Sequence, residues 1–90
     1  MVLTGNTRSR FSVHTEFEPS TLARVLDLFT VRGLACDTMT ARRTSDGLQW
    51  IELHCSDVED QHANLLLNQI RQIITVRTAR VETTLLAAAA

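Results

Sequence analysis

The chain has 90 residues and a formal net charge of −1 at pH 7, and 44% of its residues are hydrophobic. This length fits one small domain, and the hydrophobic content is too high for a disordered protein. A charge this close to zero argues against nucleic-acid binding, which needs a clustered cationic face. No apolar run approaches the roughly 18 residues that span a bilayer, and residues 1–10 lack the apolar stretch of a signal peptide. The sequence therefore predicts a soluble cytoplasmic domain with no membrane partner.

Both ends of the chain are expected to lie outside the folded part. Residues 1–9 are polar and without periodicity, which favours a flexible lead-in. Residues 83–90 end in four alanines and predict a disordered, alanine-rich tail. The folded domain is therefore expected to span residues 10–82.

The first half of this domain predicts a strand, a helix and a second strand. Apolar and polar residues alternate over residues 11–16, which is typical of a half-buried strand. Pro19 is expected to end that strand and to lie at the threshold of a helix that Ser20 caps. The helix should end at Gly33, because glycine accepts the left-handed conformation there. Residues 34–43 then predict a second strand. The apolar stripe expected on the helix comprises Leu22, Val25, Leu26 and Phe29.

The second half predicts a strand, a helix and a last strand. Asp46-Gly47 is a strong hairpin signal, so residues 48–55 should pair with the strand before them. Residues 56–59 read Ser-Asp-Val-Glu, a capping box that predicts a helix to about Gln72. Residues 76–82 are rich in β-branched side chains, which favours a fourth strand. The inward residues of the third strand are Ile51, Leu53 and Cys55, and the buried stripe of the helix is Leu66, Leu67, Ile70, Ile73 and Ile74.

The order βαββαβ predicts an α+β fold, a ferredoxin-like sandwich. It is a four-stranded antiparallel sheet in the spatial order 4-1-3-2, with both helices on one face. The opposite face is then free of helices. The residues expected to point outward on it are His14, Glu16, Trp50, Glu52, His54 and Arg80.

The sequence carries no catalytic or metal-binding motif at the spacings that such chemistry needs. Cys36 and Cys55 form no C-x-x-C pair and are expected to be reduced, buried and close together on adjacent strands. His14 and His54, with Glu16 and Glu52 nearby, could form a surface metal site or an acid–base pair. A single small sheet offers no enclosing pocket, which favours a polar face that is solvated or contacts another protein.

Trp50 is the only tryptophan of the chain, and the strand phase that buries Ile51 exposes it. Tryptophan is enriched at binding hot spots, so we interpret Trp50 as an interface anchor, with a ring folded over its own sheet as the alternative. A base-stacking role is disfavoured, because RNA-binding sheets carry several aromatic and basic residues and Trp50 stands among carboxylates. The predicted partner-binding residues are Trp50, Glu52, His54 and Arg80.

The start of the first helix is a second candidate site. The first N–H groups of a helix lack partners and carry partial positive charge, so they can hold a small carboxylate. Simple N-capping by Ser20 explains the same residues and is the more common arrangement.

The segment from Pro19 to Thr40, PSTLARVLDLFTVRGLACDTMT, resembles the ACT domain, a small βαββαβ module that senses amino acids. More narrowly, the order of FEPSTLARVL, RGLACDTM, IEL, NQIRQI and TVRTARV across residues 10–82 resembles the small subunit of acetolactate synthase, also called acetohydroxyacid synthase, in its short isozyme II type. The positions that fall on the ACT spacing are Pro19, Leu22, Val25, Phe29 and Gly33.

The resemblance implies a regulatory subunit that is not an enzyme and holds no cofactor. It would form a homodimer, and it would bind and activate the catalytic large subunit of branched-chain amino-acid synthesis, which would carry thiamine diphosphate, Mg and FAD. Two alternatives remain open. One is a free-standing ACT sensor that acts on another protein, and the other is a small enzyme that uses the face with His14, Glu52 and His54.

The resemblance also implies where an amino-acid effector such as valine would bind. In the larger small subunits of this family, the effector carboxylate lies near the start of the first helix, and an Asn at the start of the second strand helps to hold it across a dimer interface. The matching positions here are Ser20 and Ala35. Ala35 offers no side-chain hydrogen bond, which predicts a weak valine response or none. The candidate effector residues are Glu18, Pro19, Ser20, Thr21, Leu22, Ala35 and Cys36.

Overall fold

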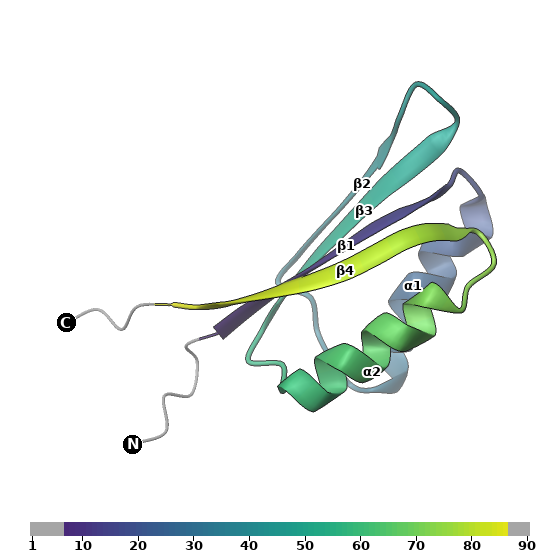
Figure 1. Cartoon of the computed structure of the whole chain (residues 1–90). Coiled ribbons are helices and arrows are strands. Elements are labelled where there is room, and N and C mark those ends of the chain that lie inside the picture. Colours follow the sequence, from purple (N-terminus) through teal and green to yellow (C-terminus); the bar gives the residue numbers. More distant parts are fainter. Residues whose placement is uncertain (1–6, 87–90) are drawn as a thin grey trace, which may run out of the picture.

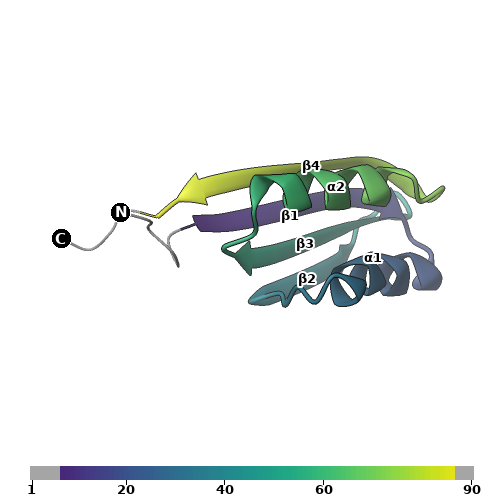
Figure 2. The same cartoon turned by 90° about the horizontal axis from the view of Figure 1, so that it is seen from below.

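Four strands and two helices in the order βαββαβ form residues 7–86, the part of the chain that the computed structural model describes (Figure 1). In chain order they are β1 (Thr7–Glu16), α1 (Pro19–Val31), β2 (Thr38–Arg43), β3 (Leu48–Ser56), α2 (Asp60–Arg71) and β4 (Val76–Leu85). The strands form one antiparallel sheet in the order β2-β3-β1-β4, and both helices cover the same face of it (Figure 2). The predicted ferredoxin-like sandwich and its strand order are therefore confirmed. Within the described residues, neither helix has the length and apolar character needed to cross a membrane.

β1 and β4 extend beyond the predicted limits of the domain at both ends. Thr7 pairs with Leu85 and Ser9 with Thr83, in continuation of the central ladder. Ser9 is fully buried, and its hydroxyl oxygen lies 3.0 Å from that of Thr83. These stretches of the predicted lead-in and tail are therefore strand, because ladder pairing satisfies their backbone although their side chains show no hydrophobic periodicity. Residues 1–6 of the predicted lead-in and 87–90 of the predicted tail lie outside the described residues.

The second strand is shorter than predicted. β2 begins at Thr38 rather than at Leu34. Gly33, at φ +68, ends α1 as expected, and the N–H of Leu34 donates to the carbonyl of Phe29 at 3.0 Å. This is the hydrogen bond of a Schellman cap, so the backbone of Leu34 closes the helix and cannot also begin the strand. The chain between the cap and Thr38 crosses to the edge of the sheet without regular structure.

Neither helix begins with the side-chain cap that the sequence predicts. Ser20 lies inside α1, whose N-cap residue is Glu18 and makes no side-chain hydrogen bond. Ser56 is still part of β3, Asp57 turns the chain with a φ of 58°, and α2 begins only at Asp60. The predicted capping box is therefore wrong, because strand pairing and the turn occupy the residues that would have formed it.

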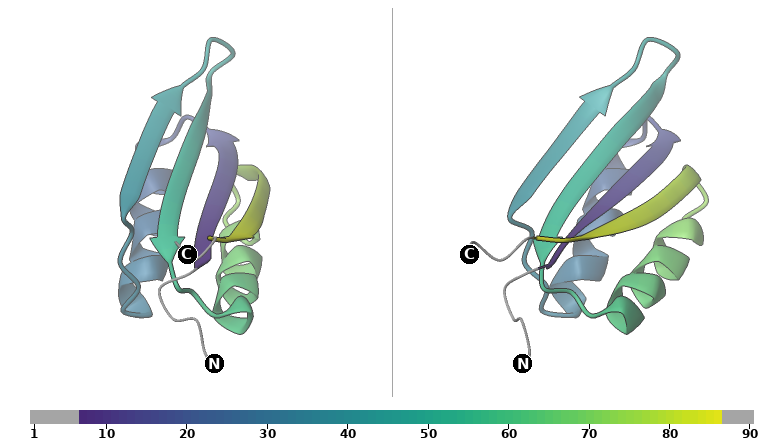
Figure 3. Two further views of the ribbon diagram at one scale, coloured as in Figure 1. Left: turned by 90° about the vertical axis from the view of Figure 1, so that its left-hand side faces the viewer. Right: turned by 60° about the vertical axis from the view of Figure 1, so that its left-hand side comes forward.

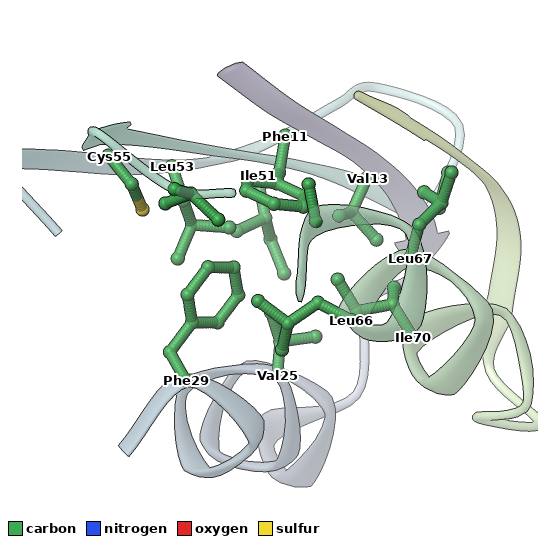
Figure 4. Close-up of a cluster of buried hydrophobic side chains, with 13 residues drawn as sticks. Phe11, Val13, Val25, Phe29, Ile51, Leu53, Cys55, Leu66, Leu67 and Ile70 are labelled. Carbon is green, nitrogen blue, oxygen red and sulfur yellow. The ribbon is translucent and has the colours of Figure 1, made fainter. Parts of the chain in front are cut away.

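The hydrophobic core fills the space between the inner face of the sheet and the two helices (Figure 4). Phe11 of β1 and Phe29 of α1 meet edge to face, with ring centroids 5.1 Å apart. The inward residues predicted for β3 are all fully buried, which confirms the phase of that strand. These residues are Ile51, Leu53 and Cys55.

The buried stripes of both helices differ in detail from the prediction. On α1 the fully buried positions are Thr21, Val25 and Phe29, at a spacing of four residues, while Leu22 and Leu26 flank the core half-buried. The hydroxyl of Thr21 lies 2.6 Å from that of Thr75, which satisfies a polar group that the hydropathy pattern would have placed outside. At the end of α2, Ile74 is 95% exposed, because the helix ends at Arg71 and the chain turns toward β4.

The two cysteines lie side by side as free thiols, with their Sγ atoms 3.8 Å apart. Cys55 is fully buried, whereas Cys36 is only half-buried, so the prediction that both are buried is correct for Cys55 alone. Burial raises the pKa of both thiols, and that of Cys55 rises to about 12. Both groups are therefore protonated and weakly nucleophilic at neutral pH.

Phe29→Ala is expected to lower the free energy of unfolding by about 3–5 kcal/mol, because it removes one ring of the Phe11 pair and leaves a cavity in the core. Leu22→Ala is the matched control, since Leu22 belongs to the stripe expected from the sequence but is only half-buried. Equilibrium urea denaturation of the parent and both variants measures the difference. Equal losses of unfolding free energy in the two variants would mean that Leu22 is packed in the core as fully as Phe29.

The raised pKa of Cys55 predicts how stability changes at alkaline pH. The thiol ionises near its ordinary pKa of 9.0 when unfolded, but keeps its proton to about 12 when folded. The contribution to stability is therefore complete below pH 9 and declines as the pH rises toward 12. Denaturation curves between these values should show a steeper decline for the parent than for Cys55→Ala. Parallel declines would contradict a buried, protonated thiol.

Candidate functional site

Figure 3 shows the face of the sheet that neither α1 nor α2 covers. The register of the strands puts the residues predicted to bind a partner on this face. The pairing register arranges its side chains in rows that cross the four strands in the order β2, β3, β1, β4. The first row is Arg42, Trp50, His14 and Thr78, the second is Thr40, Glu52, Ser12 and Arg80, and the third is Thr38, His54, Arg10 and Glu82. We call these three rows the outer face. All the predicted partner-binding residues lie on it.

Trp50 lies on the outer face, as predicted, but its ring is half-buried. The indole stacks on the imidazole of His14, with ring centroids 4.7 Å apart and 16° between the ring planes. One face of the indole is thus covered by the chain itself, which corrects the expectation of a freely exposed anchor. The cause is the register, which makes Trp50 and His14 direct cross-strand neighbours.

An open hollow of about 650 Å³ lies beside Trp50 and spans all four strands. The residues that line it are Arg10, Ser12, Thr40, Arg42, Trp50, Glu52 and Arg80. Its lining therefore holds three arginines and one carboxylate, whereas the sequence interpretation placed Trp50 among carboxylates. Arg10 and Arg42 were missed as site residues, although both share the period-two phase of neighbours that were assigned outward.

Several charges of the outer face are paired within the chain. Arg10 and Glu82 form an ion pair of 2.6 Å, Arg80 approaches Glu82 to 3.9 Å, and His54 lies 3.4 Å from Glu52. The Arg10 guanidinium holds the pKa of the Glu82 carboxyl below its ordinary value. Among residues 7–86, Arg42 takes part in no ion pair.

The histidines of the outer face do not converge on a common point. His14 stacks on Trp50 in the first row, and His54 contacts Glu52 from the third row. In the described part of the chain, no three His, Cys, Asp or Glu side chains cluster closely enough to hold a metal ion. The observed contacts are those of a polar protein surface.

The candidate effector residues fall into two groups at opposite ends of α1. One group, Glu18, Pro19, Ser20, Thr21 and Leu22, lies at the start of the helix, while Ala35 and Cys36 follow its end. The 13 residues of α1 span about 20 Å, so one chain does not bring the two groups together. A site that uses both groups needs a second copy of the chain.

The geometry at the start of α1 limits what each side chain can offer. Thr21 is fully buried and its hydroxyl meets that of Thr75, so its side chain faces the core rather than an effector. A hollow of about 180 Å³ opens beside Ser20, between α1 and the α2–β4 connection. Sequence reasoning missed its other lining residues because they are brought there only by the packing of α2. They are Arg24, Ile73, Ile74 and Thr75.

Comparisons with known proteins agree with this geometry. A family model described as "ACT-like domain" matches residues 4–88. No curated protein matches the chain.

Among solved structures, the chain is similar to the ACT domain of the GTP pyrophosphokinase of Chlorobium tepidum, at 12% identity and a TM-score of 0.73 over 86% of this chain and 99% of that one. The chain is also similar to the C-terminal domain of the Mycobacterium tuberculosis MgtC protein, at 11% identity and a TM-score of 0.74 over 100% of both chains. A third similar structure is the regulatory subunit of the Thermus thermophilus aspartate kinase, at 17% identity and a TM-score of 0.68 over 90% of this chain and 53% of that one. At these identities the structures support the fold, and the family model extends over nearly the whole chain. The chain therefore belongs to the ACT-like domain family.

Proposed function

We propose that this chain is a regulatory small subunit that binds and activates the thiamine-diphosphate-dependent catalytic subunit of acetolactate synthase, in the biosynthesis of valine, leucine and isoleucine. Domains of the ACT-like family typically have a regulatory, small-molecule-binding role without catalysis, and the proposal specifies the partner. The observation that carries it is the run of motifs that resembles the short small subunits, because each motif coincides with an element of the fold. PSTLARVL opens α1, RGLACDTM leads from its cap into β2, and IEL lies at the centre of β3.

We propose the outer face as the surface that contacts the catalytic subunit. It carries no helix, and it combines a half-buried aromatic ring, Trp50, with charged residues around it. Aromatic and arginine side chains are the commonest hot-spot residues of protein interfaces. Glu52, His54 and Arg80 would orient the partner around the indole.

We propose that two copies of the chain pair through β2. Every residue of β2 is exposed, including Met39 on the side of the sheet that faces the helices, where it is 43% exposed. Phe17 lies exposed beside the same hairpin, with the Arg43 guanidinium 4.5 Å from its ring centroid. An edge strand with unpaired backbone groups and apolar neighbours gains stability when a second copy continues the sheet.

An amino-acid effector, in this proposal, binds weakly or not at all, because Ala35 offers no side-chain hydrogen bond at the position that would reach it from the second copy. Thiamine diphosphate, Mg and FAD belong to the catalytic subunit. We place the complex in the cytoplasm, since free thiols such as Cys36 and Cys55 are the usual state in a reducing compartment.

The proposed dimer predicts the sedimentation behaviour of the purified chain. It should sediment as a dimer at micromolar concentration, and Met39→Glu should shift it toward a folded monomer, because a charge is then held against its own copy across a two-fold interface. Sedimentation velocity with a circular dichroism spectrum of each sample measures both effects. A parent chain that is monomeric and folded at this concentration contradicts the pairing.

The proposed partner predicts a gain in acetolactate formation when the chain is added to the catalytic subunit encoded in the same genome. At limiting chain, Trp50→Ala should lose most of the stimulation, because truncation of a central aromatic anchor costs about 2–4 kcal/mol of binding. Leu65→Ala is the control, since Leu65 is a large apolar residue of α2 that is 43% exposed and far from the outer face. If the parent chain gives no stimulation, the proposed activating function is wrong. If a folded Trp50→Ala chain stimulates as well as the parent, the outer face is not the contact surface.

A further inference from the structure

We propose that the outer face recognises an acidic segment of its partner, in which two carboxylates meet Arg42 and Arg80 and an apolar side chain between them rests on Trp50. The inference rests on the proposed function for the identity of the partner, the catalytic subunit. The chemistry of the recognition follows from the charges, the shape and the strand spacing of the face itself.

The charge of this face differs in sign from that of the whole chain. The outer face carries three arginines, Arg10, Arg42 and Arg80, against two carboxylates, Glu52 and Glu82. The excess of positive charge here contrasts with a formal net charge of −1 for the chain. A face of this sign attracts a partner surface of opposite sign.

The arginines of the hollow differ in whether their guanidinium N–H groups are already paired with a carboxylate of the chain. Arg10 is engaged by Glu82 at 2.6 Å, whereas Arg80 approaches the same carboxylate only to 3.9 Å. Arg42 has no ion-pair partner within residues 7–86, and it lies directly across from Trp50. Arg42 and Arg80 therefore keep donors for an incoming carboxylate, which a guanidinium binds with two parallel hydrogen bonds.

The spacing of the strands defines the segment that fits. Arg42 lies on β2 and Arg80 on β4, the two edges of the sheet, and Arg80 lies one row, or two residues, further along the strands. Three strand spacings across and two residues along place their Cα atoms about 16 Å apart. Residues four apart in an extended peptide span about 13 Å, and the arginine side chains are long enough to reach across the difference. In an extended chain the residue midway between them points to the same side. It would lie over the hollow beside Trp50, which gives the pattern acidic-x-apolar-x-acidic.

The same features favour a peptide over a nucleic acid or a small molecule. Trp50 is the only aromatic residue of the chain besides three phenylalanines, and one face of its ring is taken by His14. Glu52 lines the hollow and would repel a phosphate backbone. The hollow is open and four strands wide, whereas small ligands bind in enclosed pockets.

The test that does not depend on the catalytic subunit is an NMR titration of the isotope-labelled chain. The probe is a blocked pentapeptide with glutamate at its first and last positions and leucine at the centre, and the matched control peptide has lysine at both ends. The glutamate peptide should shift the indole N–H signal of Trp50 and the guanidinium signals of Arg42 and Arg80, and the lysine peptide should not. Arg42→Gln should remove most of the shift, while Arg32→Gln, at the C-terminal end of α1 on the helix side of the sheet, should not. Equal shifts with both peptides, or none, overturn the inference, as does tighter binding of a single-stranded oligonucleotide.

The second test uses the complex with the catalytic subunit. Its dissociation constant should rise as ionic strength increases from about 0.05 to about 0.5 M, because exposed charges are then screened. Arg42→Glu should weaken binding about tenfold, since it repels the partner's carboxylate, and Arg32→Glu, at the end of α1 on the helix side of the sheet, should leave the constant unchanged. A dissociation constant that changes neither with ionic strength nor with Arg42→Glu overturns the inference but leaves the proposed function intact. If the catalytic subunit never binds but the glutamate peptide does, the proposed function is wrong and the inferred recognition of an acidic segment stands.

Discussion

The pairing of β1 with β3 on one side and β4 on the other is the constraint on which the rest of the structure depends. These two ladders put Phe11 and Val13 into the core, and the same alternation puts Ser12 and His14 on the outer face. Because the side-chain period of a strand is two, a slip of one residue would exchange the two faces. The helices then pack on the apolar side alone, and the polar side remains open for a partner.

The outer face shows how internal pairing shapes what a surface can recognise. The carboxylate of Glu82 is shared between Arg10 and Arg80, and that of Glu52 is contacted by His54. These pairs lie in the second and third rows, and Arg42, beside Trp50 in the first row, has no ion-pair partner within residues 7–86. Exposed ion pairs of this kind add little stability, so their main consequence is to decide where net charge remains.

Most of the fold could be predicted from the sequence, because it depends on local and periodic signals. The alternation through Ile51 and Leu53 fixed the phase of β3, and Gly33 and Gly47, at φ +68 and +80, end α1 and turn the hairpin as their position predicts. The caps could not be predicted in the same way. Ser56 has the sequence context of a cap, yet the pairing of β1 with β3 extends to it and makes it strand instead.

The sequence by itself determined the order of the elements, the phase of β3 and the presence of Trp50 on the open side. Only the tertiary structure decided which side chains surround that tryptophan. His14 is separated from Trp50 by a helix and a strand, and Arg42 lies across the hairpin turn from it; both become its neighbours through the registers of β1 and β2 against β3. Likewise, Thr21 is buried because Thr75 of the α2–β4 connection meets its hydroxyl. Periodicity is a property of one segment, whereas contacts across strands and between layers depend on the relative placement of two segments, which no single segment encodes.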